Sequence, residues 1–205
     1  MKAKRAAIMA GGRGSRMDGP KAAADLAGRP LIAYPIAAVR KAGLEPIVVA
    51  KADTDLPALD CEVVIEAPEP VHPLAGIVAA LERYGEPLVV VACDLPLVPA
   101  PLLAALAARQ SPLVVPADPG PQPLLARYGP ELLPRLRAWL ASAAPMRRLV
   151  VELDAEVIAG EELRRYGDPD RFLTNVNDAG GLARARELLA AGDRRDGRPP
   201  TPAGG

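Results

Sequence analysis

The sequence predicts an α/β fold, a three-layer, doubly wound, mainly parallel sheet with helices on both faces. Short apolar runs alternate with segments of helical spacing along most of the 205 residues, and the connections between them have the length usual in βαβ units. The apolar runs are rich in β-branched residues and are too short for buried helices. We expect one domain over residues 1–192 and a disordered tail over 193–205, where almost no apolar side chain is available to anchor the chain.

The strongest strand signal is Pro87–Cys93 (PLVVVAC), a nearly continuous β-branched run that ends at Asp94. The other extended segments are expected at Ala6–Ala10, Pro46–Ala50, Glu62–Ile65, Leu113–Val115, Pro123–Tyr128, Glu152–Ile158 and Phe172–Val176. Helical spacing predicts helices at Leu31–Ala42, Leu74–Tyr84, Ala100–Arg109, Glu131–Ala141 and Ala179–Ala191. The less regular region Pro116–Glu162 allows an antiparallel excursion or a small subdomain.

Charge and cysteine content exclude several classes of function. Lys plus Arg number 25 and Asp plus Glu number 25, so the net charge of zero argues against coating nucleic acid or an anionic membrane. No apolar run approaches the ~20 residues of a membrane span. Cys61 and Cys93 are distant in sequence and His72 is the single histidine, which argues against a disulfide scaffold or a zinc site. A reducing cytoplasm is therefore the expected location.

The first predicted strand runs directly into a glycine-rich, cationic loop, Gly11-Gly12-Arg13-Gly14-Ser15-Arg16, which continues to Pro20-Lys21. A loop after the first strand of a parallel sheet lies at the carboxyl ends of the strands, where α/β proteins bind ligands. Glycines allow the backbone to approach a phosphate, and Arg13, Arg16 and Lys21 add positive charge. The loop predicts a triphosphate cradle, although an ordinary loop with solvated arginines is the alternative. It matches neither the P-loop nor the dinucleotide-binding pattern.

Asp94 follows the most hydrophobic strand and is expected to face the same crevice. A carboxylate there is suited to Mg²⁺, which takes one or two protein carboxylates together with substrate phosphates. The alternative is a turn or helix-capping role before Leu95-Pro96.

Asn175 and Asn177 are two positions apart, so their side chains would share one face if the segment is extended. Either amide oxygen would serve as a neutral ligand to the same Mg²⁺. Asn177 and Asp178 are also candidates to cap the helix that begins near Ala179.

The segment from His72 to Gly76 begins a predicted helix. Gly76 allows close approach of a ring or a ribose, and tight helix–sheet packing is the alternative. For His72 a surface position is the simpler interpretation. Arg147 and Arg148 either bind an anionic second substrate or form a solvated face, and Cys93 is interpreted as a buried strand-end residue without a base to activate it.

Taken in order, these motifs resemble the molybdenum cofactor guanylyltransferases, the MobA family. The matching segments are Ile8-Met9-Ala10-Gly11-Gly12, Arg16-Met17 with Lys21, Leu26-x-Gly28-x-Pro30-Leu31-Ile32, Pro73–Ile77, Cys93–Pro96, Gln122–Tyr128 and Phe172-x-x-Asn175-Val176-Asn177. They span nearly the whole chain apart from the tail. The opening signature is shared by many nucleotidyltransferases, whereas the ordered set is much more specific.

The resemblance implies a Rossmann-like nucleotidyltransferase that moves GMP from GTP to the terminal phosphate of molybdopterin and releases pyrophosphate. It implies Mg²⁺ as the cofactor, held by Asp94 with Asn177 or Asn175, and Arg16 and Lys21 as the cations on the triphosphate. The same resemblance assigns nucleotide contacts to Ala10, Gly11, Gly12, Gly14, Ser15, Lys21, Leu74, Ala75, Gly76 and Asp94. Partner proteins would deliver molybdopterin or receive the product.

Two alternatives stay open from the sequence. Pro20-Lys21 is closer to sugar-nucleotide enzymes, which suggests another acceptor such as a sugar phosphate or a different cofactor precursor. Cytidylyl transfer to molybdopterin is a further variant of this alternative, although Gly11-Gly12 and the Pro73–Gly76 turn resemble the guanylyl branch. A noncatalytic nucleotide-binding protein on the same fold is the other alternative, because a fold does not by itself determine function.

Overall fold

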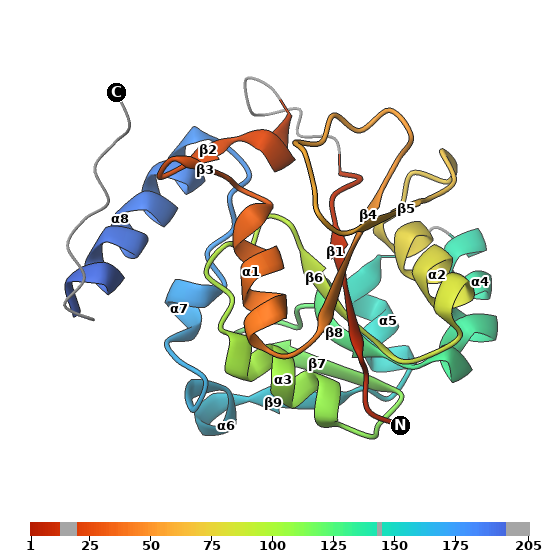
Figure 1. Cartoon of the computed structure of the whole chain (residues 1–205). Helices are drawn as coiled ribbons and strands as arrows, with labels where there is room; N and C mark the ends of the chain where they lie inside the picture. Colours follow the sequence, from red (N-terminus) through yellow and green to blue (C-terminus); the bar gives the residue numbers. More distant parts are fainter. Residues whose placement is uncertain (13–19, 143–144, 196–205) are drawn as a thin grey trace.

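A seven-stranded sheet forms the centre of the protein, seen here in a computed structural model that describes residues 1–12, 20–142 and 145–195 (Figure 1). The strands of this sheet are β1 (Arg5–Met9), β4 (Glu45–Ala50), β5 (Glu62–Ile65), β6 (Leu88–Ala92), β7 (Leu113–Ala117), β8 (Leu125–Tyr128) and β9 (Glu156–Ala159). Their spatial order is β5-β4-β1-β6-β8-β7-β9. Because β5, β4, β1 and β6 are parallel neighbours, their carboxyl ends share one edge of the sheet.

Helices cover both faces of the sheet, which confirms the three-layer α/β prediction. They are α1 (Ala33–Lys41), α2 (Pro73–Tyr84), α3 (Ala100–Ala108), α4 (Leu133–Ser142), α5 (Met146–Glu152), α6 (Gly160–Arg164), α7 (Pro169–Phe172) and α8 (Ala179–Arg195), with short 3₁₀ turns η1 (Lys21–Ala23) and η2 (Pro130–Leu132). One apolar cluster packs α1 and α3 against the sheet, and a second packs α2, α4 and α5 against the opposite face (Figure 1). The central strand β6 is fully buried, as its β-branched run predicts.

The irregular middle region contains the antiparallel excursion that the sequence allowed. Strand β8 runs antiparallel to both β6 and β7, and β9 then pairs parallel with β7. The excursion extends the sheet beyond β6. It therefore leaves the four parallel neighbours β5, β4, β1 and β6 intact, and these strands end at the candidate site.

A small two-stranded unit lies beside the main sheet. It comprises β2 (Asp25–Leu26) and β3 (Arg29–Pro30), and α8 packs over it through a cluster formed by Leu26, Leu31, Val176 and Ala185. Helix α8 continues to Arg195, and the disorder expected for the tail from residue 193 stays a prediction. The remainder of the tail lies outside the described residues.

The prediction of a last strand over Phe172–Val176 is wrong. The structure has helix α7 over Pro169–Phe172 and an irregular segment after it. The helix begins there because Asp168 caps it, accepting a hydrogen bond from the Asp170 amide at 3.1 Å, and Pro169 occupies the first helical position.

The extended segment predicted over Glu152–Ile158 is only partly present. Helix α5 ends at Glu152, and β9 occupies Glu156–Ala159. The apolar run that starts at Leu149 belongs to the buried face of α5, where Leu149 and Val150 pack into the core. Within the described parts of the chain, no helix combines the length and apolarity that a membrane crossing requires.

Candidate active site

Four segments with polar groups meet where the parallel strands end. In spatial order across the sheet they follow β5, β4, β1 and β6, and they contribute Glu66, residues 51–55, Gly11-Gly12 and Asp94. The sheet hydrogen bonds continue past the strand ends, since the Cys93 amide donates to the Met9 carbonyl at 3.1 Å. The sheet therefore fixes the first residues of these loops. Since α/β proteins bind ligands at the carboxyl ends of their parallel strands, this edge is the expected ligand site.

Lys21 and Asp94 form the centre of the site, although 73 positions separate them. The Lys21 ammonium donates to Asp94 Oδ2 at 2.7 Å and to Asn177 Oδ1 at 2.6 Å. The Lys21 side chain is 14% exposed and that of Asp94 is 19% exposed, so this ion pair is largely shielded from solvent. The expected meeting of the cationic loop with Asp94 is present at Lys21.

A backbone hydrogen bond fixes the asparagine segment beside Asp94. The Val176 amide donates to the Asp94 carbonyl at 2.9 Å, which holds Asn177 over the end of β6. Asp178 caps α8 by accepting a hydrogen bond from the Gly181 amide at 2.8 Å. The cap therefore belongs to Asp178, and the Asn177 side chain is directed to Lys21.

Asn175 differs from Asn177 because the segment is not extended. Its side-chain amide donates to the Leu173 carbonyl at 3.1 Å, and the two asparagines do not share a strand face. Of the two asparagines, Asn177 is therefore the one that this geometry brings to Asp94 through Lys21.

The donor set fits a magnesium ion completed by a substrate. Asp94 Oδ1 is buried and has no hydrogen-bond partner within the described residues, an arrangement that normally requires a ligand. The described part of the chain contains no group of three or more His, Cys, Asp or Glu side chains that could hold a metal alone. One carboxylate and one amide oxygen suit Mg²⁺ when phosphate oxygens supply further ligands.

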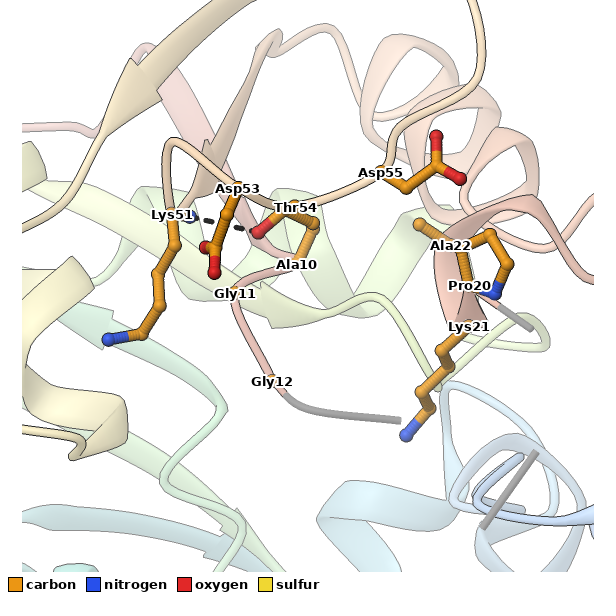
Figure 2. A pocket seen from close by; sticks show the side chains of 10 residues that line it. All are labelled: Ala10, Gly11, Gly12, Pro20, Lys21, Ala22, Lys51, Asp53, Thr54 and Asp55. Carbon is orange, nitrogen blue, oxygen red and sulfur yellow. Dashed lines mark hydrogen bonds between the residues drawn. The ribbon is translucent and has the colours of Figure 1, made fainter. Parts of the chain in front are cut away.

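A cavity of about 320 Å³ opens beside the glycine turn (Figure 2). Its lining comprises Ala10, Gly11, Gly12, Pro20, Lys21, Ala22, Lys51, Asp53, Thr54 and Asp55. The loop after β4 forms one wall and η1 forms the other, with Gly11 and Gly12 between them (Figure 2). The Lys51 amide donates to Thr54 Oγ1 at 3.1 Å, which folds this loop into a tight turn, and Asp53 turns its carboxylate toward the glycines (Figure 2).

Glu66 is a buried carboxyl group that the sequence analysis missed. The Glu66 side chain lies between Gly11 and Gly76, because a Cβ atom on either glycine would overlap its carboxylate oxygens. Only 7% of the residue is exposed, and this burial raises the pKa of Glu66 while the nearby Lys51 opposes the shift.

The start of α2 is closely packed. Leu74 is fully buried, Ala75 is 7% exposed, and neither lines the cavity. Gly76 packs against Glu66, Met9 and Val49. This agrees with the alternative of tight helix–sheet packing at Gly76. His72 caps the helix, since its Nδ1 accepts a hydrogen bond from the Leu74 amide at 3.1 Å. Nucleotide contact by Leu74, Ala75 or Gly76 stays a prediction.

Arg13, Gly14, Ser15 and Arg16, which are predicted to contact phosphate, lie outside the described residues. Burial raises the pKa of Cys93 to about 12, so its thiol stays protonated and is a poor nucleophile. Arg147 and Arg148 are exposed on α5, whose partners lie on the α2 and α4 face, which agrees with the interpretation as a solvated surface.

Asp53, Thr54 and Glu66 were not anticipated, although a signal for them existed. They follow predicted strands, as Asp94 does, and the rule that directed attention to Asp94 applies equally to residues after β4 and β5. What the sequence lacked was the order of strands, because only that order shows which strand ends lie beside the glycine turn.

The fold and the site together define a class of protein. A glycine turn, a lysine and a strand-end carboxylate line the ligand edge of a parallel sheet, and this combination suits binding and transfer of a phosphorylated nucleotide.

Comparisons with known proteins identify the family within this class. Residues 6–157 match the model of the MobA-like NTP transferase domain, and the chain belongs to this family of nucleotidyltransferases. It is 34% identical to the molybdenum cofactor guanylyltransferase of Shewanella amazonensis over 146 residues, which cover 67% of this chain and 74% of the relative. It is 30% identical to the probable molybdenum cofactor guanylyltransferase of Carboxydothermus hydrogenoformans over 180 residues, or 83% and 89% of the two chains.

A solved structure agrees with the fold. Molybdopterin-guanine dinucleotide biosynthesis protein A from Archaeoglobus fulgidus superposes with a TM-score of 0.77 at 24% identity, covering 91% of this chain and 99% of that one. The match extends beyond residue 157, the limit of the family model, and so includes part of the C-terminal region.

Proposed function

We propose that the protein transfers GMP from GTP to the terminal phosphate of molybdopterin, with Mg²⁺ as cofactor, and releases pyrophosphate. The observation that carries this proposal is the contact of Lys21 with Asp94 and Asn177 beside the Gly11-Gly12 turn. The names of the relatives from Shewanella and Carboxydothermus support guanylyl transfer over other reactions of the class.

We propose a direction for the nucleotide along the site from the order of the strands. The triphosphate lies at the glycine turn after β1, and the metal and the acceptor lie toward Asp94 after β6. The base then extends to the opposite side, toward the ends of β4 and β5. A cavity of about 320 Å³ at the β4 side supports this orientation.

Guanine is the base that best complements the groups on that side. Asp53 lines the cavity on that side, and an ionised carboxylate accepts hydrogen bonds but does not donate them. Guanine offers two adjacent donors, N1–H and the N2 amino group, whereas cytosine and adenine place an acceptor beside their single amino group. The Asp53 carboxylate on the base side therefore favours GTP over CTP and ATP.

The reaction requires positioning and charge stabilisation more than proton transfer. A molybdopterin phosphate oxygen forms a bond to the α-phosphorus of GTP, and the bond from that phosphorus to the bridging oxygen breaks to release pyrophosphate. The attacking phosphate is already an anion near neutral pH, since its second pKa is about 6. No strong general base is needed, which suits a site whose side chains are a lysine, an aspartate and an asparagine.

Lys21 supplies positive charge to the phosphates, and the amides of Gly11 and Gly12 lie where a phosphate can approach the backbone. Asp94 and Asn177 would hold Mg²⁺, which supplies further neutralisation of phosphate charge when bound. Arg16, Gly14 and Ser15 keep their proposed phosphate contacts.

We also propose partner proteins and a cellular location for the reaction. A molybdopterin-delivering protein and a molybdoenzyme that receives the product are the expected partners. Cys61 and Cys93 are both free thiols, in agreement with the cytoplasmic location that we propose.

Pyrophosphate release tests the proposal directly. The full chain is incubated with molybdopterin, Mg²⁺ and either GTP or CTP, and we expect release with GTP to exceed release with CTP by at least about tenfold. A preference for CTP would contradict the base assignment. Release only with a sugar phosphate as acceptor would favour the alternative acceptor, and binding without release under every condition would favour a noncatalytic nucleotide-binding protein.

A further inference from the structure

The Lys21 ammonium is bonded to one oxygen of each side chain that is proposed to hold the metal. Its contacts are 2.7 Å to Asp94 Oδ2 and 2.6 Å to Asn177 Oδ1, while Asp94 Oδ1 has no partner within the described residues. A divalent cation bound by these two side chains would lie within a few ångströms of the ammonium, and like charges at such a distance repel strongly in a partly shielded site. The lysine and the metal therefore compete for the same two side chains.

We infer that Lys21 is an internal competitor of the metal, which leaves Asp94 and Asn177 only when a triphosphate offers it a new partner. The inference rests on the proposed function to the extent that the site takes a metal and a nucleoside triphosphate. Metal and nucleotide then bind as a coupled pair, because the phosphates both attract the lysine away and supply further metal ligands.

The oxygens are fixed more firmly than the ammonium. Asp94 follows the fully buried strand β6, and its carbonyl accepts a hydrogen bond from the Val176 amide at 2.9 Å. Asn177 comes directly after Val176, so the same hydrogen bond positions both oxygen donors. The long, rotatable lysine stem is the part that can change place at low cost.

The Lys21 side chain can also move toward the phosphates of a bound nucleotide. It lines the cavity together with Gly11 and Gly12, so the side chain that bonds to the proposed metal ligands borders the place of the phosphates as well. A movement about the side-chain torsions is sufficient, and the 3₁₀ turn η1 that carries Lys21 does not have to unfold.

This competition has a thermodynamic consequence. The protein alone binds a divalent cation weakly, because the charge of Lys21 cancels that of Asp94. A triphosphate raises the affinity for the metal, and by linkage the metal raises the affinity for the triphosphate by the same factor. Removal of the lysine charge is expected to strengthen metal binding by the protein alone and to reduce this coupling factor.

The test is a titration of the full chain with Mn²⁺ alone, followed by electron paramagnetic resonance of the free ion. Mn²⁺ accepts the same oxygen ligands as Mg²⁺ and is directly observable. We expect Lys21→Met to bind Mn²⁺ at least about tenfold more tightly than the unchanged protein, because the repulsive charge is gone. Lys21→Gln serves as a second variant if Lys21→Met lowers the melting temperature.

Two controls separate the specific contact from a general change of charge. Lys51→Met removes a lysine from the wall of the same cavity, where the ammonium donates to the Pro68 carbonyl, and it is expected to leave the Mn²⁺ affinity within about twofold. If Lys21 and the metal compete for Asp94, the gain in Mn²⁺ affinity seen in Lys21→Met should be lost when Asp94→Asn is added to that variant.

A Lys21 variant that binds Mn²⁺ no more tightly than the unchanged protein, including one with no measurable binding, would overturn the inference. An equal gain in Lys51→Met would overturn it as well. The test also distinguishes this inference from the proposed function. If the Lys21 variant binds Mn²⁺ more tightly but the unchanged protein releases no pyrophosphate from GTP, only the proposed reaction is contradicted. If pyrophosphate is released but the variant shows no gain in Mn²⁺ affinity, only the competition is contradicted.

Discussion

At the scale of single residues, Lys21 carries the largest share of the proposed chemistry. Its ammonium is largely shielded from solvent, and its two contacts are with the oxygen donors of the site. A cation held in a partly dry site stabilises developing phosphate charge more than one in water does.

Replacement of Lys21 by alanine is predicted to lower the turnover of GTP to pyrophosphate by about 10²–10³-fold, the usual effect of removing one well-placed donor of positive charge. Steady-state rates at saturating GTP give the measurement. Arg147→Ala, on the exposed surface of α5, is the control and should retain full turnover. Near-native turnover in Lys21→Ala would remove this residue from the mechanism.

Glu66 gives a prediction for stability against pH. Burial raises its pKa in the folded protein, so the ionised form is disfavoured there relative to the unfolded chain. The cost is absent at low pH, where the group is protonated in both states, and it develops as pH rises through the folded pKa.

Glu66→Gln removes that cost and keeps nearly the same size between Gly11 and Gly76. The variant should therefore melt at a higher temperature than the unchanged protein at pH 8, and the difference should shrink toward zero near pH 4. Thermal unfolding across this range is the measurement. A difference that is constant with pH would show that the carboxyl group does not titrate with a raised pKa.

At the scale of elements, the strands that end at the site were predictable and the segments that complete it were not. The run PLVVVAC is apolar because β6 is buried on both faces, and such runs identify central strands from local sequence. The order of the strands depends on distant pairings, and so the approach of Glu66 and Asp53 to the glycine turn was not visible.

The wrong strand at Phe172–Val176 has a local cause. The apolar and β-branched residues of FLTNV favour a strand, but the Asp168-Pro169 cap just before them begins helix α7, which ends at Phe172. The function assigned to Asn177 did not depend on that strand, because the hydrogen bond between Val176 and Asp94 brings the segment to the site.

The junction between this segment and α8 depends on Gly181. A Cβ atom there would lie 2.6 Å from the Asn175 carbonyl oxygen, whereas one on Gly180 would lie 3.3 Å from Asp178 Oδ1. Gly181→Ala should lower the free energy of unfolding by about 1–2 kcal/mol through overpacking. Gly180→Ala should change it by less than about 1 kcal/mol, since improved helix propensity offsets the mild crowding.

Urea unfolding of both glycine variants provides the comparison. The Gly181 variant should also weaken GTP-dependent turnover, because its clash displaces the backbone that carries Asn177. Equal stability of the two variants would contradict the close packing of α8 against residues 175 and 176.

At the scale of the whole molecule, ligand binding should stabilise the fold, because the site joins the ends of β1, β4 and β6 with the start of α8. GTP with Mg²⁺ at 100 times its dissociation constant is predicted to add about 2.7 kcal/mol to the free energy of unfolding. Thermal unfolding with GTP, CTP and ATP at equal concentration measures the effect, and equal stabilisation by all three would contradict selection of guanine.

Nucleotidyl transfer is proposed to take place between the glycine turn and Asp94. Asp94→Asn tests it most directly, because the change removes one charge and preserves the shape of the side chain and the backbone bond to Val176. We predict that Mg²⁺-dependent pyrophosphate release from GTP falls at least about 10²–10³-fold while the melting temperature stays close to that of the unchanged protein. Turnover near that of the unchanged protein would contradict the account.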